Sequence, residues 1–205
     1  MSLTLFRSDG GFLTLPDRTS LLVSRENGGN LVVNPPRPVW ERSELSPAEL
    51  SQFAFLVGAA GRAMIDVLPQ LVGGCVNYWE AGNWALNDEA EPKGPKRAES
   101  YRQMHLHLLG RSPASTDPSW KWGESPRFPA FAEKHWWAAR FERLTAAECY
   151  QIVSRADELL RTKYGLLSGQ IARWSPCDAC GYPSPVAIGE SPHVCVECAS
   201  GRVRL

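Results

Sequence analysis

Two histidines, spaced two residues apart, are the residues of this chain best suited to do chemistry. The segment 103–111 reads Gln-Met-His-Leu-His-Leu-Leu-Gly-Arg, with polar and apolar side chains alternating at its start. A period of two predicts a β-strand that buries Met104, Leu106 and Leu108 and places residues 103, 105 and 107 together on the other face. We expect that face to present an amide and two imidazoles in a row, a set that suits an anion or a metal ion.

Two other interpretations of these histidines stay open. They can be ordinary surface residues of a half-buried strand. They can also begin a zinc site, although such a site needs three or four convergent ligands. No Asp, Glu or Cys lies within the strand to supply the others.

The strand resembles the signature of the histidine triad (HIT) superfamily of nucleotide hydrolases and transferases. That signature has three histidines alternating with apolar residues, then a short apolar stretch and a glycine. Here His105 and His107 take the second and third positions, and Gln103 replaces the first. The resemblance implies that His105 is the nucleophile and that His107 donates to phosphoryl oxygens. Gln103 is a departure, since an amide donates hydrogen bonds but does not exchange a proton near neutral pH.

The elements upstream are similar to the HIT order as well. Residues 30–37 look like the strand and turn of the family. Ser46, Pro47 and Glu49 then predict a capping box at the start of a helix. Apolar residues recur at helical spacing after it, at Leu50, Phe53, Leu56, Val57, Ala60 and Met64. The resemblance covers roughly residues 15–115, about one small domain.

Further site residues follow from the resemblance alone. Glu26 corresponds to an acidic residue that accepts from ribose hydroxyls, and Ser100 to a phosphate-binding serine. Asn77 or Asn83 corresponds to an asparagine close to the phosphate, with Asn77 preferred because it ends a short apolar strand. Each asparagine can instead be an Asx-turn or strand-end residue, and Ser100 a solvated serine.

A loop before Ser100 carries three cations, Lys93, Lys96 and Arg97, between proline and glycine residues. Such a loop is usually solvated. The alternative is that one of these cations holds the far phosphates of a polyphosphate.

Four of the six cysteines form two Cys-x-x-Cys pairs near the C-terminus: Cys177 with Cys180, and Cys195 with Cys198. This pattern predicts a zinc ribbon in which four thiolates hold one structural Zn²⁺. The alternative is two disulfides, which require an oxidising compartment. Cys75 and Cys149 are expected to be buried thiols.

An aromatic-rich stretch from Trp120 to Phe141 lies between these modules. We expect its rings either to pack the ribbon against the nucleotide domain or to cover a bound base by stacking. Thr145 and Glu148 then predict a second capping box, opening a scaffold helix that runs to about Tyr164.

Composition narrows the function classes. The 205 residues include 22 basic and 22 acidic ones, so no strongly basic nucleic-acid surface is indicated. The N-terminus lacks the basic start and long apolar run of a secretory signal. The longest apolar stretch, around residues 53–60, is too short to span a bilayer. We therefore expect a cytoplasmic protein without a membrane segment.

The sequence as a whole predicts an α+β protein, with a HIT-like antiparallel sheet with helices and a small C-terminal zinc ribbon. The expected division is a nucleotide-binding domain (1–115), an aromatic-rich linker and helix (116–170), and the ribbon (171–205).

The resemblance implies a nucleotide hydrolase or nucleotidyl transferase that cleaves a phosphoric anhydride, ester or phosphoramidate bond through a nucleotidyl-histidine. Two alternatives stay open: a repair enzyme that removes 5′-adenylate from DNA, as aprataxin does, and a nucleotide sensor or adaptor without catalysis. A nucleotide is the expected partner, a homodimer is left open, and charge does not point to nucleic acid.

Overall fold

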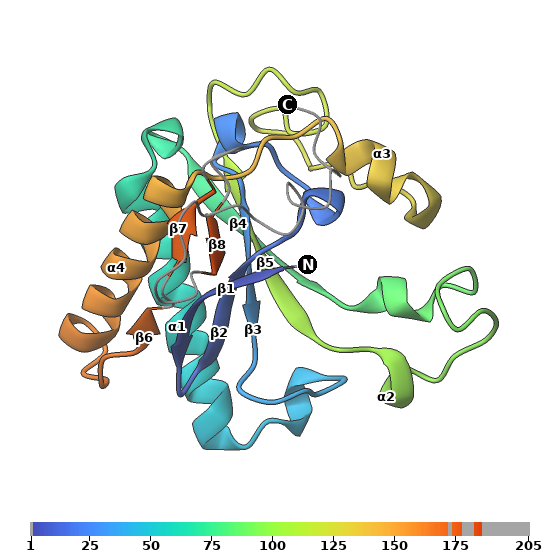
Figure 1. Ribbon diagram of the computed structural model, residues 1–205, viewed down its shortest axis with the longest axis horizontal. Coiled ribbons are helices and arrows are strands. Elements are labelled where there is room, and N and C mark those ends of the chain that lie inside the picture. The colour runs from blue at the N-terminus through green and yellow to red at the C-terminus, as the bar shows by residue number, and fades with distance from the viewer. Residues whose placement is uncertain (1, 172–173, 178–182, 186–205) are drawn as a thin grey trace.

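A six-stranded antiparallel sheet organises the computed structural model, which describes residues 2–171, 174–177 and 183–185. Its order is β4-β5-β3-β2-β1-β6 (Figure 1). The strands are β1 (Leu3–Ser8), β2 (Gly11–Leu15), β3 (Asn30–Asn34), β4 (Cys75–Ala81), β5 (His105–Arg111) and β6 (Gln170–Ile171). This confirms the expected α+β class with an antiparallel sheet and helices.

Two long helices cover one face of this sheet and lie side by side (Figure 1). They are α1 (Pro47–Val67) and α4 (Ala146–Thr162), and both begin at the predicted capping boxes, with Ser46 and Thr145 as N-caps. Their apolar faces form the main core with the inward side chains of the strands. Helix α4 therefore packs in the same core as α1 and the sheet.

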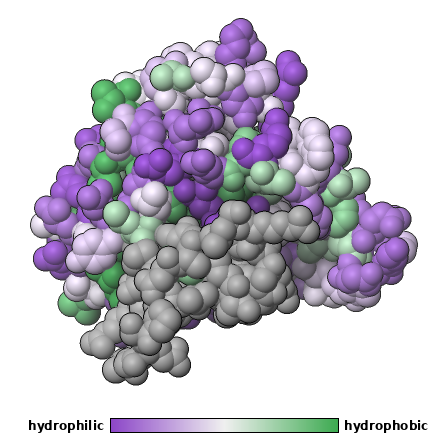
Figure 2. Space-filling model, turned by 45° about the horizontal axis from the view of Figure 1, so that its top comes forward, coloured by the Kyte–Doolittle hydropathy of each residue, from purple (hydrophilic) through white to green (hydrophobic). Residues whose placement is uncertain are grey.

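The opposite face of the sheet carries a smaller apolar cluster of Leu22, Val23, Leu109 and Trp120. Trp120 is among the largest fully buried side chains of the described residues. Two short helices, α2 (Ala98–Tyr101) and α3 (Lys134–Ala138), lie outside the main core. Polar side chains cover most of the described surface in Figure 2, with hydrophobic ones in small groups between them.

Helix α1 is long and apolar enough, by length and composition, to cross a membrane, contrary to the expectation from the sequence. A helix that lies in a protein core passes the same test. In this fold α1 buries Phe53, Leu56 and Met64 in the main core.

Gly110 in β5 lets a turn approach the sheet closely. Its N–H donates to the carbonyl of Gly29, and an added Cβ would lie 2.5 Å from the carbonyl carbon of Gly28. This contact holds the turn after the helical segment Arg25–Asn27 against β5. The chain just before that turn provides Leu22 to the second face of the sheet.

We therefore expect Gly110→Ala to lower the free energy of unfolding by about 2 kcal/mol or more, since backbone atoms must move to admit the methyl group. Gly123→Ala is the control: its methyl meets open space, so only backbone strain of about 1 kcal/mol at positive φ applies. Urea denaturation of both variants measures the difference. Equal losses would show that the close approach at Gly110 carries no energetic weight.

Candidate active site

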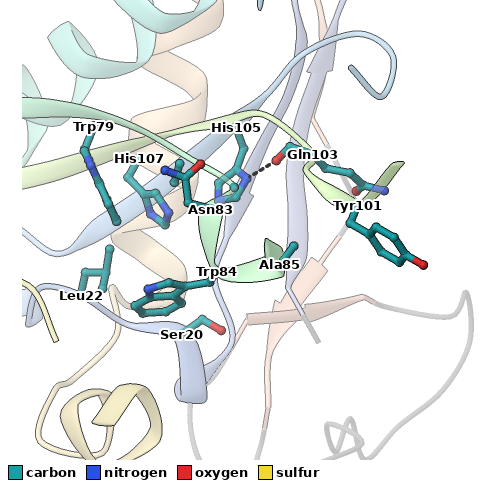
Figure 3. A pocket seen from close by; sticks show the side chains of 12 residues that line it. Ser20, Leu22, Trp79, Asn83, Trp84, Ala85, Tyr101, Gln103, His105 and His107 are labelled. Carbon is teal, nitrogen blue, oxygen red and sulfur yellow. Dashed lines mark hydrogen bonds between the residues drawn. The ribbon is translucent and has the colours of Figure 1, made fainter. Parts of the chain in front are cut away.

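A cavity of about 530 Å³ opens on the second face of the sheet, beside the two histidines (Figure 3). Twelve residues line it, and none has a formally charged side chain when the two histidines are neutral: Ser20, Leu22, Trp79, Ala81, Gly82, Asn83, Trp84, Ala85, Tyr101, Gln103, His105 and His107. All three predicted catalytic residues are thus brought together. The mixture of aromatic walls and a few polar groups is typical of a small-molecule site.

Strand β5 positions both histidines because it lies between β3 and β4. His107 is the register partner of Val32 on one side and of Trp79 on the other, and His105 pairs with Ala81. Residues two apart on a strand share a face, and the two imidazole centroids lie 5.0 Å apart.

Two details of the predicted strand were wrong. The strand begins at His105, so Gln103 precedes it, although the Gln103 side chain still reaches the cavity. The backbone carbonyl of Gln103 is engaged by the ring of His105 instead of a neighbouring strand. His107 is buried rather than exposed because aromatic side chains cover this face of the sheet.

His105 has one ring nitrogen fixed by the backbone. Its Nδ1 lies 2.9 Å from the carbonyl oxygen of Gln103. A carbonyl only accepts, so Nδ1 must carry the hydrogen and Nε2 keeps its lone pair. Burial lowers the pKa of His105 below its ordinary value of 6.5, and the nearby charge of Arg102 acts in the same direction. At pH 7 the ring is therefore neutral, with Nε2 available as a nucleophile.

His107 is fixed in the opposite tautomer by Asn30. The Leu22 N–H donates to Oδ1 of Asn30 at 3.1 Å, which turns the Asn30 amide nitrogen toward Nδ1 of His107, 3.4 Å away. Since an amide nitrogen only donates, Nδ1 of His107 accepts and Nε2 carries the hydrogen. Burial, with a smaller contribution from His105, lowers the pKa of His107 to about 3. His107 therefore stays neutral and is a hydrogen-bond donor through Nε2.

A column of aromatic rings holds His107 in place. Trp79 stacks on His107 with centroids 5.4 Å apart, and Phe128 stacks on Trp79 at 4.3 Å. Trp120 meets the edge of Phe128 at 5.7 Å. The aromatic-rich stretch thus packs against the site through Trp120 and Phe128, and none of its rings lines the cavity.

The two candidate asparagines differ in position. Asn83 lines the cavity, in the short helical segment Asn83–Leu86 that follows β4. Asn77 shares a face of β4 with Trp79 and Ala81 but lies outside the cavity lining, opposite Leu109. Of these two asparagines, Asn83 is therefore the one placed to meet a ligand in this cavity.

The structure does not bring Glu26 or Ser100 to this cavity. Both are exposed, Glu26 in the helical segment Arg25–Asn27 and Ser100 in α2. The three loop cations also stay outside the lining. Lys96 Nζ donates to the carbonyls of Asn87 and Gly94. Lys93 and Arg97 pair with local carboxylates of Glu89 and Glu99.

Several site residues were missed in the sequence. Alternation within β4 could have placed Trp79 on the face of Asn77. Trp84 lies in the short helical segment Asn83–Leu86, which has no periodic pattern of apolar residues. Asn30 and Arg102 act through pairing between distant segments, which one sequence does not reveal.

The zinc prediction falls mostly outside the described residues. Strands β7 (Trp174–Pro176) and β8 (Pro183–Pro185) pair antiparallel, and buried Cys177 follows β7 directly. Cys180, Cys195 and Cys198 lie outside the described residues, so the four-thiolate site stays a prediction. Within the described part of the chain, no group of three or more His, Cys, Asp or Glu side chains is arranged to hold a metal ion. Of the other cysteines, Cys149 is buried and Cys75 half-buried.

Comparison with known proteins adds no assignment. No known protein family, curated protein or solved structure matches the chain.

The low pKa of His107 predicts a pH-dependent stability. The unfolded residue gains a proton below about pH 6.5 while the folded one stays neutral down to about pH 3, so stability falls as pH drops through this window. Between about pH 7 and pH 5, above the carboxylate range, this amounts to roughly 2 kcal/mol. His107→Phe should remove this contribution in urea denaturation and leave that of His105, whose pKa is also lowered, whereas His135→Gln, at an exposed histidine, should retain both. A slope unchanged in His107→Phe would show that His107 is not held neutral.

Proposed function

We propose that this protein is a nucleotide hydrolase or nucleotidyl transferase that acts at the α-phosphate through a nucleotidyl-His105 intermediate. One observation carries the proposal: two imidazoles face one cavity, half-buried His105 with its Nδ1 on a backbone carbonyl and buried His107 with its Nδ1 on an amide nitrogen. His105 offers a lone pair and His107 a proton-bearing nitrogen. A nucleophile beside a donor is what displacement at phosphorus requires.

In the first step the Nε2 lone pair of His105 attacks phosphorus in line with the leaving group. The bond from phosphorus to the leaving oxygen breaks, and its electron pair departs with that oxygen. The proton on Nδ1 stays on the ring, where the carbonyl of Gln103 stabilises the positive charge of the nucleotidyl-imidazolium. Water or another acceptor then attacks the same phosphorus and gives up its proton to solvent. The P–N bond breaks, and its electron pair returns to Nε2.

Neutral donors surround the place where the phosphoryl oxygens would lie. His107 contributes Nε2–H, and the side-chain amides of Gln103 and Asn83 line the same cavity. Such fixed donors act most strongly in a cavity that excludes water. The aromatic wall of Trp79 and Trp84 suits the flat, uncharged part of a nucleotide.

Gln103 restricts the leaving group in this proposal. His107 is neutral and gives up its proton too reluctantly to act as an acid, and the Gln103 amide does not exchange one. The departing oxygen therefore leaves without a protonated side chain beside it. Phosphoric anhydrides and esters of acidic alcohols fit this site better than phosphoramidates, whose amine must be protonated to leave.

The intermediate itself can be detected. Incubation with the p-nitrophenyl ester of AMP, followed by quenching without acid, should increase the intact mass by one adenylyl group. We expect no adduct in His105→Ala and formation about 100-fold slower in His107→Phe, which removes one oxyanion donor. His135→Ala, at an exposed histidine, is the control and should form the adduct as the wild type does.

If the protein binds AMP but neither forms an adduct with the p-nitrophenyl ester nor cleaves it, the catalytic proposal fails and a nucleotide sensor is favoured. An adduct that persists in His105→Ala would place the nucleophile elsewhere. Turnover confined to nicked, 5′-adenylated DNA would favour end repair over free nucleotides.

The leaving-group restriction has its own test. The wild type should cleave the p-nitrophenyl ester of AMP much faster than the phenyl ester, because phenolate is the more basic leaving group. Gln103→His supplies a group able to protonate it and should raise the phenyl-ester rate about 100-fold, the lower end of general acid catalysis. The p-nitrophenyl rate should change little.

Gln103→Asn keeps an amide and should leave the ratio of the two rates unchanged. If Gln103→His raises both rates equally, or neither, residue 103 plays no part in leaving-group departure.

A further inference from the structure

Arg102 is a nearly buried arginine next to the cavity, with a side chain only 11% exposed. Its guanidinium donates to the backbone carbonyl of Trp40 and to the carboxylates of Glu41 at 3.1 Å and Glu80 at 3.2 Å. Its remaining nitrogen, Nε, lies 3.1 Å from Oδ1 of Asn83. The guanidinium thus joins the loop after β3, strand β4 and the segment that lines the cavity.

The contact with Arg102 fixes which end of the Asn83 amide faces the cavity. A guanidinium only donates, so the Asn83 atom that faces it must be the oxygen. The amide nitrogen then points away from Arg102. In Figure 3 the nitrogen of Asn83 lies on the side of His107 and the oxygen on the other.

We propose that Arg102 is a positioning residue, which orients the Asn83 amide so that its nitrogen donates to an anionic phosphoryl oxygen of the substrate bound beside His105. The inference rests on the proposed function and deepens it by naming the residue that orients the Asn83 amide. At this position the site takes a hydrogen-bond acceptor, such as a phosphoryl oxygen, rather than a group that only donates.

Arg102 acts through geometry and not as a phosphate-binding cation. Glu80 also pairs with Arg42, so two arginines and the carboxylates of Glu41 and Glu80 form a cluster without net charge. All three guanidinium nitrogens of Arg102 are already hydrogen-bonded within the protein. These bonds use four of its five N–H groups, and Arg102 is not among the residues that line the cavity, so its influence on a ligand runs through Asn83.

The isosteric change Asn83→Asp separates this role from a purely structural one. An aspartate keeps the oxygen that accepts from Arg102 but replaces the donor with a second acceptor. We expect AMP binding, followed by tryptophan fluorescence, to weaken about tenfold or more, the loss typical of a hydrogen bond to an anion. Adenosine, which has no phosphate, should bind as tightly as it does to the wild type.

Arg102→Gln should weaken AMP binding by a similar factor, and the double variant Arg102→Gln/Asn83→Ala should be no weaker than Asn83→Ala alone. Arg42→Gln removes a cation from the same Glu80 without touching Asn83, so it should retain AMP binding. Should Arg102→Gln fail to fold, the comparison of Asn83→Asp with Asn83→Ala still decides, because both are expected to lose AMP selectively.

Three outcomes would overturn the inference, and they are distinguishable. If Asn83→Asp binds AMP like the wild type, Asn83 only anchors Arg102. If Arg102→Gln folds and binds AMP normally while Asn83→Ala does not, Asn83 needs no positioning. If the wild type binds neither AMP nor adenosine and forms no adduct, the proposed function fails and this role fails with it.

Discussion

The hydrogen bond from His105 Nδ1 to the backbone carbonyl of Gln103 decides which imidazole nitrogen meets a ligand. It depends on the path of the chain just before β5, where the residues on either side of Gln103 are both hydrogen-bonded to the segment 39–40. The N–H of Met104 donates to the carbonyl of Val39, and Arg102 is bound to the next residue, Trp40. With residues 102–104 fixed in this way, the Gln103 carbonyl is left for the ring of His105 instead of a neighbouring strand. The backbone at Gln103 therefore determines which nitrogen of His105 is free to react.

Two identical side chains acquire different roles here through their partners. One imidazole faces a carbonyl and the other faces an amide nitrogen, so one presents a lone pair and the other a hydrogen. The antiparallel sheet makes this arrangement possible because period-two alternation sends Leu106 and Leu108 into the main core and both histidines to the cavity. Burial beneath Trp79 keeps the ring of His107 neutral, and partial burial lowers the pKa of His105 as well.

Strand alternation and helix capping depend on residues close together in the sequence, so the features that follow from them could be predicted. Alternation around His105 gave the buried and cavity-facing sides of β5, and both long helices begin at the expected capping boxes. The partners of the histidines could not be predicted in this way, since Asn30 meets His107 only after β3 and β5 pair across 77 positions of sequence. Glu26 and Ser100 were placed by resemblance alone, and short helical segments expose both side chains to solvent.

We infer that His105 and His107 are both neutral and that they carry their hydrogens on different ring nitrogens. Nitrogen-15 NMR of the imidazole rings at neutral pH, with each histidine assigned through its glutamine variant, tests it directly. We expect His105 to carry its hydrogen on Nδ1 and His107 to carry its hydrogen on Nε2. Two rings in the same tautomer, or a protonated His107, would contradict it.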